Sequence, residues 1–371
     1  MIDRDTIKRL AAVEDPWAVS LYVPKEEEGD MFAYDELQVK KLVNEVDKLM
    51  ETRDMPPSQR QAFQGRLDAL LARPHFFNRY QAGTLAIFVS PSRLEAVDVP
   101  LQLDEFVYLG EEFYLRPIVA LLNDLERYLV LAVGPESVYL YEGTSSNLTQ
   151  LANLTPFSDE TGTPEKLGQI DGTDSAAPPL HVKSYLQKVD DRLRQTVADA
   201  EAPLIIAGTE WLVGAYRQLS RYGNILPKGI PFQAQKDDRK ALVNRAKPLV
   251  EEYMRECKAA KRRDFIQEML KGNASISLID ILAAAVEGQV ANLYLDRDED
   301  SAGVFKPAIK FAKVGETKES GGDTALFNLA AIKTFLRGGS VYDLPRKDLP
   351  DTTTSINATF RGDGDPDFLE A

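Results

Sequence analysis

Few residues of this chain have the types and spacing that a catalytic site requires. Its two histidines, His75 and His181, lie far apart in the sequence, and neither has a cysteine or acidic cluster at ligand spacing. Neither a G-x-x-x-x-G-K-[ST] phosphate loop nor a G-x-S-x-G nucleophile turn occurs. The stretch 162–166 (GTPEK) and the glycines at 321–322 resemble phosphate-binding loops only superficially. We therefore expect no metal, no cofactor and no standalone small-molecule enzyme.

The single cysteine, Cys257, excludes an internal disulfide framework and fits a reducing cytoplasm. It continues an apolar stripe along a predicted helix, so we expect it to pack in a core. No run of about 18 apolar residues occurs, which predicts no membrane span. The first residues also lack the basic-then-apolar layout of a signal peptide.

The formal net charge of −14 argues against a protein that coats nucleic acid through its overall charge. Local basic clusters remain, and the largest contains Lys258, Lys261, Arg262 and Arg263. A solvated helix face is the simpler interpretation of that cluster.

The stretch 155–180 (TPFSDETGTPEKLGQIDGTDSAAPPL) combines glycines and prolines with almost no apolar periodicity. Such a stretch cannot bury a core, so we expect a surface loop of 155–180 between two strands and an amphipathic helix. Loops of this length in compact domains are usually functional or disordered.

The remaining chain predicts a multidomain fold of the α+β and α/β classes in three segments. In the first, the patterns predict helices over 3–13, 35–50 and 58–72, the last capped by Ser58, and strands over 18–23, 84–89, 94–99 and 105–109. In the second, they predict helices over 116–125, 181–198 and 210–222, a hairpin of 128–133 with 137–141, a buried strand over 202–208, and an exit linker over 223–235.

The third segment opens with a long predicted helix over 237–271. Two similar units follow: a helix over 278–286 or 323–337, a glycine stop at Gly288 or Gly338, and a strand over 290–295 or 340–344. A polar segment, 296–322, separates these units, and 355–361 is the last predicted strand.

Three stretches, in this order, carry a resemblance to a known family. They are SLYVP (20–24), FYLRPIVALLN (113–123) and ALFNLAAIKTFLRGGSVYDLP (325–345). They resemble the bacterial relatives of the archaeo-eukaryotic class 1 release factor and of the ribosome-rescue protein Pelota. The resemblance implies an N-terminal decoding-centre domain (1–111), a central RNase H-like domain (112–232) carrying the 155–180 loop, and a C-terminal domain like ribosomal protein L7Ae (233–371).

In release factors, the central domain carries a Gly-Gly-Gln loop that helps water to cleave peptidyl-tRNA. The resemblance places Leu167-Gly168-Gln169 at this position, with leucine for the first glycine, and leucine resists the positive φ that glycine permits. Hydrolysis is therefore not expected. The residues implied to face the peptidyl-transferase centre are Gly162, Thr163, Gly168, Gln169 and Gly172. A second Gly-Gln pair, 288–289, lies at a predicted helix stop and is interpreted as structural.

The release factor reads stop codons with an Asn-Ile-Lys-Ser turn, and the equivalent stretch here, 32–36, has no such sequence. The residues implied to contact the decoding centre are Met31, Phe32, Tyr34, Lys40 and Lys41. With neither hallmark, the chain is most similar to the Balon-type ribosome hibernation factors. The resemblance then implies a cytoplasmic factor in the A site of the 70S ribosome, contacting 16S and 23S rRNA and ribosomal proteins, with elongation factor Tu as a partner.

Three alternatives remain open from the sequence. The first is a peptidyl-tRNA hydrolase that depends on Gln169. The second is a Pelota-like rescue factor that acts with a GTPase and leads to subunit splitting. The third is a binding module for stress or defence that does not act on the ribosome, since a fold does not by itself determine function.

Overall fold

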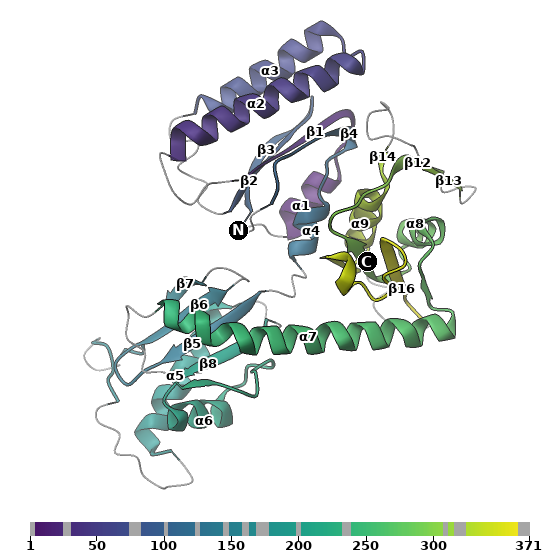
Figure 1. Ribbon diagram of the computed structural model, residues 1–371. Helices are drawn as coiled ribbons and strands as arrows, with labels where there is room; N and C mark the ends of the chain where they lie inside the picture. The colour runs from purple at the N-terminus through teal and green to yellow at the C-terminus, as the bar shows by residue number, and fades with distance from the viewer. Residues whose placement is uncertain are drawn as a thin grey trace. The chain divides into compact units, whose positions relative to one another are not determined.

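The structure is a computed structural model that describes residues 4–24, 31–73, 83–99, 103–122, 127–143, 148–157, 163–167, 178–197, 202–231, 239–306, 311–314 and 324–362. It divides into two compact units (Figure 1). We call Met1–Asn123 together with Lys261–Ala371 the terminal unit, and Asp124–Ala260 the central unit.

The terminal unit begins with an antiparallel sheet in the order β3-β2-β1-β4. Its strands are β1 (Glu14–Pro24), β2 (Thr84–Val89), β3 (Leu94–Val99) and β4 (Phe106–Glu112). Side chains alternate between faces along a strand, so Leu21 and Ile87 enter one core while Tyr22 and Phe88 enter another. Because both faces of β1 and β2 are buried, these strands appear in the sequence as nearly continuous apolar runs.

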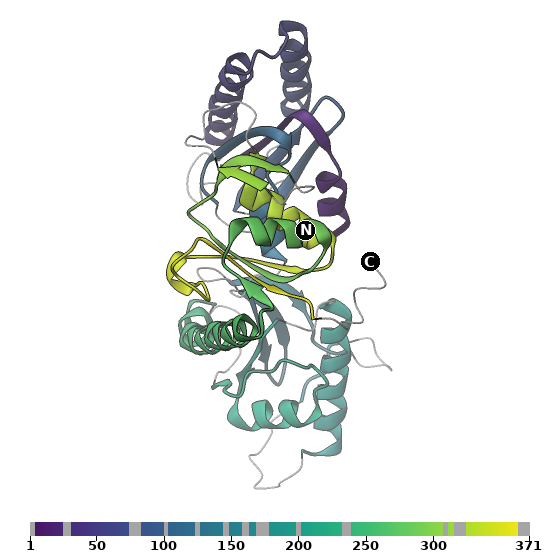
Figure 2. The ribbon, with the colours of Figure 1, turned by 90° about the vertical axis from the view of Figure 1, so that its right-hand side faces the viewer.

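Helices cover both faces of this sheet. α2 (Met31–Thr52) and α3 (Pro57–Leu71) cover one face, and Figure 2 shows them as a pair at the top of the molecule. α1 (Arg4–Ala11) and α4 (Arg116–Leu121) pack against the other face. The predicted cap Ser58 is wrong: Pro56 is the N-cap residue, and no side chain caps α3. Pro57 takes the first helical position, where proline's missing N–H costs no hydrogen bond.

A second sheet of the terminal unit has the order β10-β16-β11-β15, with β11 parallel to β15. Its strands are β10 (Ala274–Ser275), β11 (Val290–Asp296), β15 (Ser340–Leu344) and β16 (Ile356–Phe360). The helices α8 (Leu278–Glu287) and α9 (Leu326–Leu336) precede β11 and β15. The predicted glycine stops are confirmed, since Gly288 and Gly338 both have a φ of 78°.

The predicted polar segment 296–322 contains strands that its sequence did not reveal. β12 (Ala302–Lys306) pairs with β13 (Phe311–Val314) and with β14 (Thr324–Ala325) in a small antiparallel sheet. A short 3-10 helix, η3 (Arg346–Asp348), follows β15.

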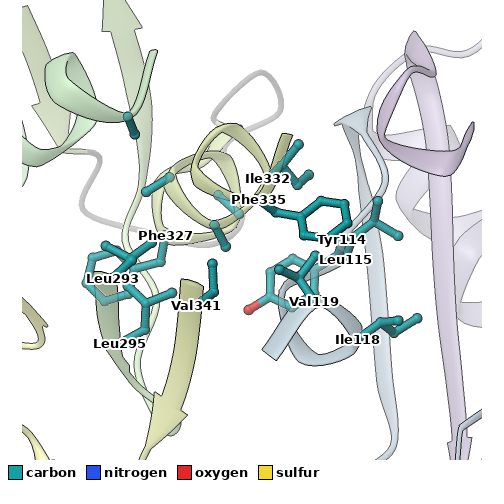
Figure 3. Packing of buried hydrophobic residues seen from close by; sticks show 14 of the residues in the cluster. Tyr114, Leu115, Ile118, Val119, Leu293, Leu295, Phe327, Ile332, Phe335 and Val341 are labelled. Atoms are coloured by element: carbon teal, nitrogen blue, oxygen red, sulfur yellow. The ribbon is translucent and has the colours of Figure 1, made fainter. Parts of the chain in front are cut away.

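One hydrophobic core joins the two sheets of the terminal unit. Tyr114, Leu115 and Val119, from α4 and the turn before it, pack in the same cluster as Phe327 and Phe335 of α9 (Figure 3). The first and third predicted segments therefore share one core. The division into three domains at 111 and 232 stays a prediction.

The central unit is a mixed sheet between helices. Its strand order is β7-β6-β5-β8-β9, with β5, β6 and β7 antiparallel and β5, β8 and β9 parallel. The strands are β5 (Tyr128–Val133), β6 (Val138–Gly143), β7 (Leu148–Asn153), β8 (Leu204–Gly208) and β9 (Ile230–Pro231). β9 lies inside the predicted exit linker, which instead contributes to the sheet.

α5 (Leu180–Thr196) and α6 (Glu210–Leu219) pack on one face of this sheet. The first part of α7 (Arg239–Lys271) packs on the other face through Leu242, Ala246 and Val250 (Figure 2). The predicted multidomain fold of mixed α and β structure is thereby confirmed. Cys257, predicted to lie in a core, is only half-buried on α7.

Among the described ranges, no helix combines the length and apolar character that a membrane crossing requires. The same ranges contain no group of three or more histidine, cysteine or acidic residues placed to hold a metal ion.

Candidate functional site

Within the predicted loop of the central unit, the structure describes a short strip, residues 163–167. Phe157 and Pro164 form an antiparallel bridge, and the backbone N–H of Glu165 donates to the carbonyl of Pro156 at 2.8 Å. These contacts join the described residues on the two sides of 158–162. The expectation of one continuous loop without core contacts is therefore wrong.

Leu167 anchors this strip in the core of the central unit. Its side chain is 8% exposed and belongs to the cluster between the sheet and α5. Its backbone N–H donates to the carbonyl of Pro135, in the β5–β6 turn, at 2.7 Å. Among the described residues Asp54 is the only non-glycine with a positive φ, so Leu167 has an ordinary backbone conformation. The leucine that replaces the first glycine is thus a core residue.

Side chains of α5 hold the same strip from the other side. Lys188 pairs with Glu165 at 2.7 Å, and Arg192 Nη1 donates to the carbonyl of Thr155 at 2.6 Å. The Arg192 guanidinium also lies 5.0 Å from the centre of the Phe157 ring, which is 46% exposed. The described residues on both sides of 158–162 are therefore held to α5.

The structure describes only one of the five predicted loop residues. Thr163 lies on the ordered strip and is exposed. Gly162, Gly168, Gln169 and Gly172 lie outside the described residues. Gln169 is two residues beyond the anchored Leu167, so chain length alone keeps its Cα within about 7 Å of that anchor.

The residues predicted to contact the decoding centre lie on α2. Met31, Phe32 and Tyr34 belong to the first turn of the helix, and their side chains are outside the described ones. Lys40 is exposed further along the helix. Lys41 pairs with Glu105, which precedes β4, at 2.5 Å. A surface ion pair of this kind contributes little stability.

The structure brings together all three stretches that carry the family resemblance. From SLYVP, the Tyr22 hydroxyl donates to the carbonyl of Tyr114 at 2.6 Å, and Ser20 Oγ accepts from the backbone N–H of Tyr114 at 2.8 Å. Asn328, from ALFNL, is fully buried on α9. Its Oδ1 accepts hydrogen bonds from the backbone N–H groups of Leu115 at 2.8 Å and Arg116 at 3.0 Å, and its Nδ2 donates to the carbonyl of Phe113 at 3.0 Å. Those three residues belong to FYLRP. One amide side chain thus satisfies backbone groups at the start of α4.

Arg116 of the same stretch is a buried cation, 2% exposed. Its Nε and Nη2 donate to Oδ1 of Asp343, from VYDLP, at 3.0 and 2.5 Å. Its remaining donors reach the carbonyls of Glu299 and Asp296. Burial opposes the charge, but the carboxylates of Asp343 and Asp300 outweigh it, so the pKa of Arg116 is raised.

Asp300 completes this network from the loop after β11. Its Oδ2 accepts a hydrogen bond from the hydroxyl of Tyr114 at 2.9 Å, and its Oδ1 accepts from the backbone N–H groups of Ser301 and Phe327. Burial raises the pKa of Asp300, against the opposing effect of Arg116. We call Tyr114, Arg116, Asp300, Asn328 and Asp343 the seam network.

Sequence reasoning missed the seam network, although a signal was present. Arg116, Asn328 and Asp343 are polar residues inside otherwise apolar stretches, and buried polar residues are the informative exceptions to the burial rule. The pairing of each carboxylate with its cation depends on contacts between residues far apart in the chain. The network satisfies its own charges and donors, so its chemistry is that of a structural lock between α4 and the second sheet.

The fold and these contacts define a class of multidomain proteins of mixed α and β structure. The central unit is a sheet between helices, and the seam network holds the terminal unit together. Within that class, residues 127–289 match the model of bacterial archaeo-eukaryotic release factor family 3. The family resemblance predicted from the sequence is thus confirmed over that stretch.

Solved structures that resemble the chain overall include Dom34 of Saccharomyces cerevisiae, at 10% identity, 99% coverage of this chain, 95% of that chain and a TM-score of 0.44. The archaeal translation termination factor aRF1 matches at 14% identity over 97% of this chain and 99% of its own, with a TM-score of 0.29. Archaeal Pelota, in a ribosome-bound complex with ABCE1, matches at 9% identity over 97% and 94%, with a TM-score of 0.41. A search of curated proteins finds no match.

Proposed function

We propose that the protein is a ribosome-binding translation factor that occupies the A site without hydrolysing peptidyl-tRNA. In this role it is a hibernation factor of the Balon type. The terminal unit contacts the decoding centre through the start of α2, and the loops of the central unit fill the space at the peptidyl-transferase centre. Elongation factor Tu is the proposed delivery partner.

The observation that carries this proposal is the anchoring of Leu167. A catalytic glutamine has to reach beyond its domain to position water at the ester bond. Gln169 follows an anchored core residue within about 7 Å, whereas Gly172, five residues from the anchor, can reach roughly 17 Å. The segment 168–177 is thus long enough to obstruct a site, while its glutamine stays near the base.

The seam network supports the same role from the terminal unit. A factor that bridges ribosomal sites benefits from a rigid frame, because ordering a flexible one would reduce its affinity. Asn328 and Arg116 tie α4, next to the N-terminal sheet, to α9 and β15. The residues at the start of α2 are therefore carried on the same compact unit as the second sheet.

The charge of the chain also fits this binding mode. A net charge of −14 disfavours indiscriminate RNA binding and favours contact with basic ribosomal proteins. Lys40 and Lys41 would supply the local phosphate contacts at the start of α2. Binding should therefore weaken as the salt concentration rises. The dependence of affinity on salt should be shallow, because few phosphate contacts are expected.

The test is co-sedimentation of the purified protein with vacant 70S ribosomes, with and without elongation factor Tu, at moderate and high salt. Binding that a tRNA in the A site prevents supports the proposal. Absence of binding under all conditions overturns it and favours a module that does not act on the ribosome. Split subunits in place of intact 70S particles would favour Pelota-like rescue.

Peptide release from ribosomes with a loaded P site tests the non-catalytic part. Wild type is expected to release no more peptide than buffer alone does. Gln169→Ala is expected to release as much peptide as wild type. Leu167→Gly restores the Gly-Gly-Gln sequence and also removes the buried leucine side chain. This variant is therefore the informative comparison with wild type. Release by wild type that Gln169→Ala abolishes would make the protein a hydrolase.

A further inference from the structure

The last turns of α7 present two different faces in the terminal unit. One face is packed: Phe265 is 2% exposed and lies edge-on to Tyr294, with ring centres 6.5 Å apart. The other carries Ile266, Met269 and Leu270, which are 49%, 38% and 85% exposed. Spacings of three and four residues place these side chains on one side of the helix.

Two arginines extend this apolar stripe by one turn. Arg262 and Arg263 are exposed and lie three to four residues before Ile266. We call Arg262, Arg263, Ile266, Met269 and Leu270 the open face of α7. An occupant that matches it must bring apolar side chains together with carboxylates.

The segment 363–371 of this chain, outside the described residues, has that chemistry. It reads DGDPDFLEA, with Phe368 and Leu369 preceded by Asp365 and Asp367 and followed by Glu370. Its charges are all negative, whereas those of the open face are positive. Acids precede the pair of large apolar residues, and the two arginines precede the apolar stripe.

The last described strand ends beside the residues that follow α7. The backbone N–H of Phe360, at the end of β16, donates to the carbonyl of Asn273 at 2.7 Å. Asn273 lies three residues beyond Leu270. Phe368 is eight residues beyond Phe360, so it can reach about 26 Å. The distance from Asn273 back to Leu270 is at most about 10 Å.

We propose that segment 363–371 docks on the open face of α7, with Phe368 and Leu369 against Ile266 and Leu270. Asp365 and Asp367 lie toward Arg262 and Arg263. Tethering makes this contact favourable even when the free segment binds weakly, because the local concentration of the segment is about millimolar. The inference does not depend on the proposed function.

Methionine methyl NMR on the full-length chain tests this proposal. Six methionines are present, and Met269→Leu assigns the signal on the open face. Phe368→Ser with Leu369→Ser in the full chain is expected to shift the Met269 methyl signal and leave that of Met50, a buried residue of α2, unchanged. High salt should shift the wild-type signal part of the way toward that of the variant. An unchanged Met269 signal would overturn the proposal.

Cross-linking gives a second readout that does not depend on shifts. In a Cys257→Ser background, Leu270→Cys with Phe368→Cys is expected to form a disulfide upon copper–phenanthroline oxidation within minutes. The matched control, Lys48→Cys with Phe368→Cys, places the first thiol on an exposed position of α2. Equal cross-linking of both pairs, or none of the first, contradicts docking.

Discussion

Asn328 accepts a hydrogen bond at 2.8 Å from the backbone N–H of Leu115, a residue 213 positions away in the chain. The start of α4 is thus capped by a side chain of α9, where the N-cap residue would ordinarily do this. The second and third resemblance stretches therefore contact each other through this side chain. This contact makes the N-terminal sheet and the second sheet parts of one unit.

The first prediction concerns this cap. Asn328→Ala leaves two buried N–H groups and the carbonyl of Phe113 without partners, and each unsatisfied group costs about 1–3 kcal/mol. We expect the free energy of unfolding of the terminal unit to fall by roughly 3 kcal/mol, measured by urea denaturation. Asn292→Ala, which removes one half-buried bond to Thr359, is the control and should cost less. Equal losses of unfolding free energy in the two variants would contradict a larger contribution from the Asn328 cap.

The second prediction concerns Arg116. Arg116→Met leaves Asp343 and Asp300 without their buried cation and should destabilise the unit by about 3–5 kcal/mol. Adding Asp343→Leu removes one stranded charge, so the double variant should be more stable than Arg116→Met alone. Denaturation of the four proteins of this cycle measures the coupling. Strictly additive losses would mean that the two residues do not interact as the distances indicate.

The third prediction separates the anchored leucine from an exposed one. Leu167→Ala should cost about 2–3 kcal/mol of stability in the central unit, because it removes buried methyl groups. Leu180→Ala is the control at the other end of the predicted loop, where the side chain is 83% exposed, and it should change stability by less than about 0.5 kcal/mol. Proteolysis within 168–177 should also speed up in Leu167→Ala only. An unchanged stability of the Leu167→Ala variant would contradict the claim that Leu167 anchors residues 163–167 in the core.

The fourth prediction is a dependence on pH through Glu112, whose side chain is buried where β4 meets α9. Burial raises the pKa of Glu112 to about 7, Lys333 opposes this rise, and Glu14 and Glu111 add to it. A carboxyl with a raised folded-state pKa binds a proton in the folded protein first. Stability is therefore expected to be greatest near pH 5 and to fall as the pH rises through 7.

Thermal unfolding between pH 5 and 8 measures this effect. Glu112→Gln keeps the shape of the neutral acid and should remove most of the decline, with its largest gain over wild type at pH 8. Glu111→Gln, at an exposed neighbour, should keep the decline. Parallel pH curves for wild type and Glu112→Gln would contradict the prediction.

The elements that the sequence predicted well are those set by local chemistry. Gly288 and Gly338 mark helix ends because glycine accepts the left-handed conformation there. The β5–β6 hairpin follows from two apolar runs around Gly134 and Pro135. These signals act within a few residues and need no knowledge of distant contacts.

The features that the sequence left out depend on tertiary contacts. β7 has only one buried residue, Leu148, so its pattern carries little apolar signal. Leu167 resembles a loop residue until the core that receives it is known. The seam network joins residues more than 200 positions apart. The predicted contacts with the ribosome stay predictions, because most of those loop residues lie outside the described ranges.

The most direct test of the central claim is to measure occupancy and peptide release on the same ribosomes. Purified 70S ribosomes carrying labelled peptidyl-tRNA in the P site would be mixed with the protein, and pelleted protein and freed peptide would be quantified together. The account predicts saturable binding that A-site tRNA displaces, with release equal to the spontaneous rate. Gln169-dependent release, or no binding at all, would contradict it.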